Sequence, residues 1–237
     1  MRRLPGTGSE RVGIRTFAYT FVPALIVVGG VAVARATVGT PIEHLTTEPT
    51  MLGQVPGYYG LVSTLGVMCW AAAVGMFLMG ACLLYDRLGR RDAAFLTASA
   101  LLTGYLAIDD AFTLHEELLP SIGIPEEAVY AGILVAVLAY AAVFRHEIAR
   151  SAWLFLVLAV GFLGTSVVID KGYELLGSPG GGGLAIWAED GAKFIGICAW
   201  VAYAALSTRG LVRSGIVRAA AGTASPIRTT GSADLPR

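Results

Sequence analysis

Charged residues are scarce in this sequence. Only 14% of its 237 residues are charged and 55% are hydrophobic, whereas a soluble domain is about 25% charged. The hydrophobic residues are gathered into long runs rather than alternating with polar ones. This pattern argues against a soluble domain with a polar surface and indicates a chain that sits in a lipid bilayer.

Cysteine and histidine are also rare, with three of each. Cys69, Cys82 and Cys198 all fall inside apolar runs without a CxxC spacing, so we interpret them as packing residues rather than disulfides or zinc ligands. No HExxH motif and no Gly-x-Ser-x-Gly motif occurs. The glycines at 180–183 are not followed by Lys-Ser or Lys-Thr, so they do not form a phosphate-binding loop.

Six apolar runs are present, each close to the roughly 20 residues that a membrane-spanning helix needs. We therefore predict an all-α, polytopic membrane protein with about six transmembrane helices in a bundle. The runs are Phe17–Thr37, Leu61–Tyr85, Ala93–Thr113, Ala128–Phe144, Ala152–Leu175 and Ala185–Leu206.

The first run has an alternative interpretation as a cleaved signal peptide. Arginines precede it, and Ala34-Arg35-Ala36 resembles a small-x-small cleavage site. A signal peptide has an apolar region of about 7–15 residues. This run is longer, which favours an uncleaved first helix.

Arginines collect on one side of a six-helix layout. The predicted loops 38–60, 114–127 and 176–184 contain no Lys or Arg. By the positive-inside rule, the arginine-rich side is cytoplasmic, together with both termini. We expect a multi-pass protein of the plasma membrane. The arginines that set this orientation are Arg2, Arg3, Arg11, Arg15, Arg87, Arg90, Arg91, Arg145, Arg150, Arg209, Arg213, Arg218, Arg228 and Arg237.

These features predict three segments: a basic cytoplasmic segment at 1–16, a transmembrane domain at 17–207 and a disordered basic tail at 208–237. Within the long loop, Thr40-Pro41-Ile42-Glu43 resembles a capping box and predicts a short helix. The expected partner is the lipid bilayer, a homo-oligomer or membrane partner is left open, and no nucleic acid is expected.

Acidic residues lie near the ends of three of the predicted helices, all towards the outer face. At a rise of about 1.5 Å per residue, Asp109 lies about 24 Å and Asp170 about 27 Å from the inner boundary of a hydrocarbon core roughly 30 Å thick. The candidate ion- or proton-binding residues are Asp109, Asp110, Glu116, Asp170, Glu174, Glu189 and Asp190, with Lys171 and Lys193 as counter-ions.

These charges are unfavourable where they lie. Several of the acids are at helix C-termini, where the helix dipole disfavours negative charge, and a charge within the bilayer costs about 2.5–3.5 kcal/mol on insertion scales. Protonation, a bound cation, contact with water at the headgroups or a static ion-pair network would each offset this cost. A divalent metal ion is one candidate cofactor, with Asp109, Asp110, His115 and Asp190 as its ligands.

Helical spacing gives three further expectations. Asp109, Thr113 and Glu116 share a face if the helix continues past Thr113, and Glu189 can pair with Lys193 four residues later. His115 is expected on another side, as an interfacial residue that could supply a further positive charge when protonated.

The leading hypothesis is a membrane protein that handles a cation, a proton or a metal through this outer carboxylate layer. One alternative is a membrane-embedded, metal-dependent hydrolase acting on lipid, in which a carboxylate or His115 is the general base. Another is a non-catalytic membrane subunit or sensor whose charges dock a partner.

Overall fold

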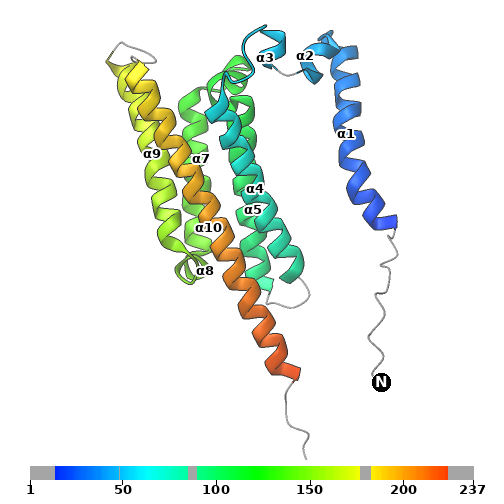
Figure 1. Cartoon of the computed structure of the whole chain (residues 1–237), viewed down its shortest axis with the longest axis vertical. Helices are drawn as coiled ribbons and strands as arrows, with labels where there is room; N and C mark the ends of the chain where they lie inside the picture. The colour runs from blue at the N-terminus through cyan, green and yellow to red at the C-terminus, as the bar shows by residue number, and fades with distance from the viewer. Residues whose placement is uncertain (1–13, 48, 85–89, 177–182, 224–237) are drawn as a thin grey trace, which may run out of the picture. The chain divides into compact units, whose positions relative to one another are not determined.

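The structure is a computed structural model that describes residues 14–47, 49–84, 90–176 and 183–223 (Figure 1). Every regular element within these ranges is a helix, which confirms the all-α prediction. The chain divides into two units, residues 1–59 and 60–237. Each unit is described by itself.

The first unit contains the first predicted helix and part of the long loop. Helix α1 covers Ile14–Val38, and the short helices α2 and α3 cover Ile42–Thr46 and Pro49–Leu52. Helix α2 begins where the capping-box pattern predicted a short helix, and the His44 amide donates to the Pro41 carbonyl across 3.1 Å. Within α1, the apolar stretch Leu25–Val38 is shorter than the roughly 20 residues that a membrane span needs.

The second unit is a bundle of long helices connected by short ones. Five of its helices are long and apolar enough to cross a membrane. Their bounds lie within three residues of the predicted runs, apart from the C-terminal end of the last helix. The long helices are α4 (Leu61–Leu84), α5 (Arg90–Phe112), α7 (Glu126–Val143), α9 (Trp153–Leu175) and α10 (Gly183–Thr223), and the short ones are η1 (Leu114–Leu118), α6 (Leu119–Ser121) and α8 (Arg145–Ala149).

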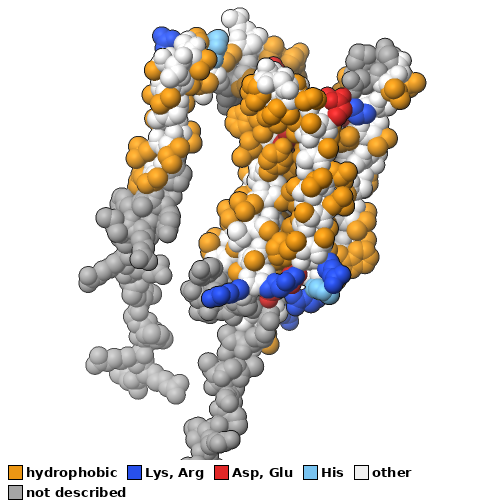
Figure 2. All heavy atoms as spheres, turned by 180° about the vertical axis from the view of Figure 1, so that it is seen from behind, with side chains coloured by type: hydrophobic (Ala, Val, Ile, Leu, Met, Phe, Trp, Pro, Cys, Tyr) orange, Lys and Arg blue, Asp and Glu red, His pale blue; other side chains and the backbone are white. Residues whose placement is uncertain are grey.

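Aromatic side chains form the centre of this bundle. Trp70 of α4 meets Trp200 of α10 edge-on with ring centroids 5.6 Å apart, and Phe77 meets Tyr203 at 6.0 Å. All four are buried. Outside this core, hydrophobic side chains cover the flank of the bundle, while Lys and Arg gather at one end (Figure 2). An apolar flank with charged ends is the pattern that a bilayer stabilises.

Helices α9 and α10 approach each other closely at Gly196. A Cβ atom at this position would lie 3.0 Å from the Leu163 amide nitrogen and 3.2 Å from the Ala159 carbonyl oxygen. Backbone atoms cannot move aside as a flexible side chain can. Glycine is therefore required here for the two helices to pack at this distance.

Helix α10 continues to Thr223, whereas the sequence predicted a disordered tail from residue 208. Composition alone suggested disorder, because the segment is rich in small residues and arginine. In the structure, Leu211 and Val212 of this segment pack against the aromatic core. The rest of the predicted tail, and most of the predicted segment 1–16, lie outside the described residues.

Candidate functional site

The chain turns sharply a few residues after Asp109 and Asp110. Helix α5 stops at Phe112, Thr113 adopts a left-handed conformation with φ 46° and ψ 45°, and the π-helical turn η1 follows. A β-branched residue rarely takes positive φ, so this turn is strained. The helix does not continue past Thr113, so the condition under which Asp109, Thr113 and Glu116 would share one helical face is not met.

The turn places His115 directly on Asp109. The His115 amide donates to Asp109 Oδ1 across 3.1 Å, and its ring Nδ1 lies 2.7 Å from Asp109 Oδ2. Both side chains are largely buried, at 12% and 8% exposure. On its other edge, Nε2 lies 3.3 Å from Glu116 Oε1. His115 is thus the partner of Asp109 rather than an isolated interfacial residue.

These contacts fix the charge of the turn. Burial disfavours the imidazolium, but hydrogen bonds to Asp109 and Glu116 outweigh burial and raise the pKa of His115 to about 9. The hydrogen bond from His115 in turn lowers the pKa of Glu116. At neutral pH, His115 is therefore a cation held between two carboxylates.

Asp110, the neighbour of Asp109, points to a different partner. Its Oδ1 lies 2.5 Å from Lys193 Nζ on α10, and its side chain is only 8% exposed. Its other oxygen, Oδ2, is buried without a hydrogen-bond partner among the described residues. Lys193 thus pairs across helices, where spacing along the sequence had suggested Glu189.

A cavity of about 60 Å³ lies beside this pair, between α4, α5 and α10. Its lining includes the charged groups of Asp110, Asp190 and Lys193, together with Ser63 and Gly66. One water needs about 10–15 Å³ of such space and two to four polar partners. The cavity therefore has the room and the polar groups for water or a small cation.

Lys171 forms a separate cluster between α7 and α9. Its Nζ lies 2.9 Å from Glu126 Oε1 and 3.7 Å from Asp170 Oδ2, and 5.7 Å from the centre of the Tyr130 ring. The Tyr130 ring also packs against His115 with centroids 5.1 Å apart. The pairing of Glu126 with Lys171 depends on how α7 and α9 meet.

The remaining candidates are less directly engaged. Glu189 is half-buried and lies within electrostatic range of Asp170, Asp190 and Lys193. Asp190 is exposed at the cavity wall. Glu174 belongs to α9, but its side chain lies outside the part of the structure described.

A metal centre does not fit these residues. Within the described ranges, no three His, Cys, Asp or Glu side chains are grouped so as to hold a metal ion. The reason is geometric: Asp109 and Asp110 face different partners, and the imidazole of His115 is engaged by Asp109 and Glu116. The four residues predicted as ligands therefore do not form the site on which the metal-dependent hydrolase hypothesis depends.

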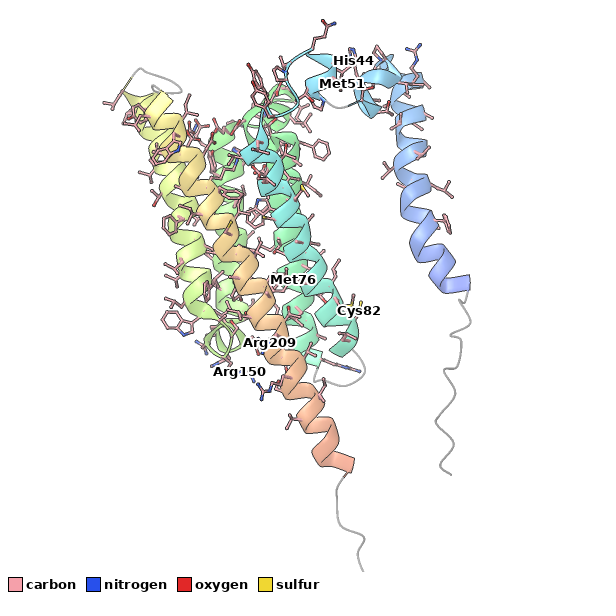
Figure 3. The ribbon with its side chains drawn as sticks, in the orientation of Figure 1. His44, Met51, Met76, Cys82, Arg150 and Arg209 are labelled. Carbon is pink, nitrogen blue, oxygen red and sulfur yellow. The ribbon has the colours of Figure 1, made fainter. Side chains whose placement is uncertain are left out.

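The opposite end of the bundle holds a charged cluster that the sequence reasoning missed. Glu147 of α8, only 3% exposed, accepts from Arg91 of α5 at 2.9 Å and lies 3.6 Å from Arg150. Arg150 also reaches the buried Asp92 at 3.3 Å. Figure 3 shows Arg150 at this end of the bundle, near the level of Arg209 on α10. The arginines had indicated membrane orientation only, and no sequence spacing links α5 to α8.

The second unit is thus a bundle of helices suited to a membrane, with a buried charged cluster near each end. The chain belongs to a family described as a domain of unknown function (DUF8692), whose model matches residues 19–206. Comparisons with curated proteins and with solved structures gave no match.

Proposed function

We propose that this chain carries protons or a small monovalent cation across the plasma membrane by exchange at Asp110, whose site opens to the outside. In this proposal the chain crosses the membrane six times and has both termini in the cytoplasm. The observation that carries it is the unpartnered Asp110 Oδ2, buried next to a polar cavity. Leaving a buried polar atom without a partner costs about 1–3 kcal/mol, so its presence favours a ligand there.

The two oxygens of Asp110 suit such a role because they differ. Lys193 neutralises the carboxylate through Oδ1 and leaves Oδ2 to accept a proton or coordinate a cation. Binding at Oδ2 weakens the hold of Asp110 on the ammonium of Lys193. Asp190, exposed at the cavity wall, offers an acceptor between Asp110 and bulk water. Ionisable residues within membrane-spanning segments often mark ion pathways and proton relays, and Asp110 and Lys193 are such a pair.

The clusters around Asp109 and Lys171 support the cavity rather than form it. Asp109 is held by two contacts from His115, which fixes the last turn of α5 and hence the direction of Asp110. Lys171 links α9 to α7 through Glu126. Glu116 and Glu189 adjust the electrostatic field at Lys193 without contacting it directly.

Flux through purified protein in liposomes tests this proposal. A pH-sensitive dye reports dissipation of a proton gradient, with Na⁺, K⁺ or no added cation on the opposite side. We expect Asp110→Asn to abolish the flux and Lys193→Met to change its pH dependence. Glu117→Gln, an exposed acid at the same end, is the control and keeps the flux. No flux from the wild-type protein under any of these gradients contradicts the proposal and leaves the non-catalytic alternative.

A further inference from the structure

Buried hydroxyl groups follow one another through the aromatic core of the bundle, between the cavity at Asp110 and the end where α8 lies. They come from α5, α7 and α10, which are all long and apolar enough to cross a membrane. A polar group in such a core is costly unless it is hydrogen-bonded. Packing of apolar side chains does not account for their position.

Three of these hydroxyl groups are in direct contact, and we call them the hydroxyl chain. Ser99 Oγ lies 2.8 Å from the hydroxyl of Tyr140, which lies 3.2 Å from the hydroxyl of Tyr203. All three side chains are buried. Because a hydroxyl group both accepts and donates a hydrogen bond, a proton can pass from one of these oxygens to the next.

One end of the hydroxyl chain leads to the end of the bundle where α8 lies. The Tyr203 hydroxyl interacts with the side chain of Ser151, which is half-buried and adjoins the exposed Arg150. One turn further along α10, the buried Ser207 Oγ accepts from the Ala152 amide across 3.4 Å. Ser151 therefore connects the hydroxyl chain to the water at this end.

The other end leads towards the cavity through a layer that contains two tryptophans. Thr103 lies one turn beyond the hydroxyl chain on α5, and its Oγ1 accepts from Trp200 Nε1 across 3.0 Å. Trp70 and Trp200 each lie one turn from a residue that lines the cavity, Gly66 on α4 and Ile197 on α10. The interval between this layer and the cavity lining is therefore about one turn, or roughly 5 Å.

Trp70 presents a donor in this interval. Its Nε1–H is buried and has no hydrogen-bond partner within the described part of the chain, which costs about 1–3 kcal/mol. An indole only donates, so Trp70 cannot relay a proton itself. It can instead hold a water molecule by donating to its oxygen.

The spacing of the hydroxyl chain selects against metal cations. Its oxygens are in hydrogen-bond contact, so an ion cannot enter between them without moving them apart. A Na⁺ or K⁺ ion must also exchange its hydration shell for several oxygen ligands, whereas the tyrosines of the chain pack against the rings of Phe95 and Phe77. A proton needs no such shell.

We infer that the species exchanged at Asp110 is a proton, and that it crosses the core along four hydroxyl groups, those of Thr103, Ser99, Tyr140 and Tyr203. This inference rests on the proposed function, whose substrate and route it names. A water molecule that accepts from Trp70 joins the first of these hydroxyls to the cavity.

Each hydroxyl takes part without a lasting change of charge. A proton that arrives on the oxygen lone pair releases the proton that the oxygen already carries to the next acceptor, and rotation of the hydroxyl restores the starting state. Ser99 and Thr103 donate to backbone carbonyls across 2.7 and 2.6 Å. Each therefore rotates away from its carbonyl when it passes a proton.

Proton flux into liposomes that contain the purified full-length protein tests this route. Tyr140→Phe with Tyr203→Phe removes two hydroxyls and keeps both rings, and we expect it to lose the flux. Tyr105→Phe with Tyr173→Phe, the matched control, removes two hydroxyls from exposed tyrosines and keeps the flux. The wild-type flux persists without Na⁺ or K⁺ on either side and is slower in D₂O.

A second pair of variants decides the matter if the double phenylalanine variant has a lower thermal unfolding midpoint than the wild type. Thr103→Val keeps the shape of the side chain without the hydroxyl and loses the flux, whereas Thr103→Ser keeps the hydroxyl and the flux. Equal flux in these two variants, full flux in the double phenylalanine variant, or a wild-type flux that requires Na⁺ or K⁺ overturns the inference.

Failure of this route is distinguishable from failure of the proposed function. If Asp110→Asn abolishes the flux while the hydroxyl variants keep it, exchange at Asp110 stands and only the route is wrong. A wild-type protein without flux, or full flux in Asp110→Asn, overturns the proposed function and the route together.

Discussion

Both ends of the bundle bury carboxylates, but the cations that pair with these carboxylates differ between the two ends. Each end buries carboxylates close to where a membrane surface would lie. Asp92 and Asp109 are 17 residues apart on α5, or about 26 Å, close to the roughly 30 Å of a hydrocarbon core. At the end where α8 lies, Glu147 and Asp92 meet arginines. At the end where η1 lies, Asp109 and Asp110 meet a histidine and a lysine.

This difference separates a fixed charge cluster from one that can change. Arginine stays protonated throughout the range in which proteins fold, so the cluster around Glu147 keeps its charges. Histidine and lysine can lose a proton, and Asp110 Oδ2, next to a polar cavity, has no hydrogen-bond partner within the described part of the chain. We therefore expect the arginine cluster to hold helices together, and in our proposal the cluster around Asp110 and Asp109 responds to protons or cations.

The largest effect should come from filling the cavity without touching a charge. In Gly66→Ala, the new Cβ lies 3.6 Å from Asp110 Oδ2 and 3.1 Å from the flexible Ile197 Cδ1. We expect complete loss of flux in liposomes, with a thermal unfolding midpoint close to that of the wild type. Gly75→Ala, on the same helix with open space around its Cβ, is the control and should keep the flux. If both variants transport equally well, the cavity is not the site of exchange.

Removing the arginines at the other end should mainly affect stability. Arg91→Ala with Arg150→Ala leaves Glu147, 3% exposed, without its cations. Because the two arginines are 62% and 58% exposed, water screens these pairs, and we expect a loss of less than about 3–5 kcal/mol, the value for a fully buried pair. A fall in the thermal unfolding midpoint in detergent is expected. Arg90→Ala, an exposed neighbour, should change the midpoint little. A double variant as stable as the wild type would show that this cluster does not stabilise the fold.

The raised pKa of His115 predicts that the thermal stability of the protein depends on pH through the end of the bundle where η1 lies. Its pKa is raised from 6.5 to about 9 in the folded protein, so its stabilising contribution is complete below about pH 6.5 and is lost as the pH rises through 9. Thermal midpoints measured between pH 6 and 10 should therefore fall for the wild type and fall less for His115→Gln. Glu147→Gln, at the arginine end, should keep the slope. A His115→Gln variant with the wild-type slope would contradict the assigned ion pair.

The smallest effect concerns the strained turn. Thr113 adopts φ 46°, a conformation that costs about 1–3 kcal/mol for such a residue and that glycine adopts freely. Thr113→Gly should raise the free energy of unfolding by up to about 1 kcal/mol, as measured by chemical denaturation. Thr97→Gly, within helical α5, is the control and should lower it slightly. A destabilising Thr113→Gly would mean that the threonine side chain makes a necessary contact.

Sequence patterns predicted the helices well because their cause is local. A run of apolar residues of the right length forms a helix in a bilayer whatever its neighbours are, and α4, α5, α7 and α9 begin and end close to the predicted bounds. The structure departs from the sequence pattern in two places: residues 208–223 belong to α10, and α5 ends in a left-handed turn at Thr113. In both places the segment makes a tertiary contact that no local pattern predicts: Leu211 packs on the core, and His115 binds Asp109.

The sequence by itself determined that acids, two lysines and one histidine cluster near helix ends on one side of the bundle, because charge and hydrophobic periodicity are properties of the chain. Only the tertiary structure decided the pairing. Adjacent aspartates point about 100° apart on a helix, so Asp109 and Asp110 reach different neighbours. Which neighbour each one meets depends on how η1 folds back and how α10 packs, and no spacing along the sequence specifies this.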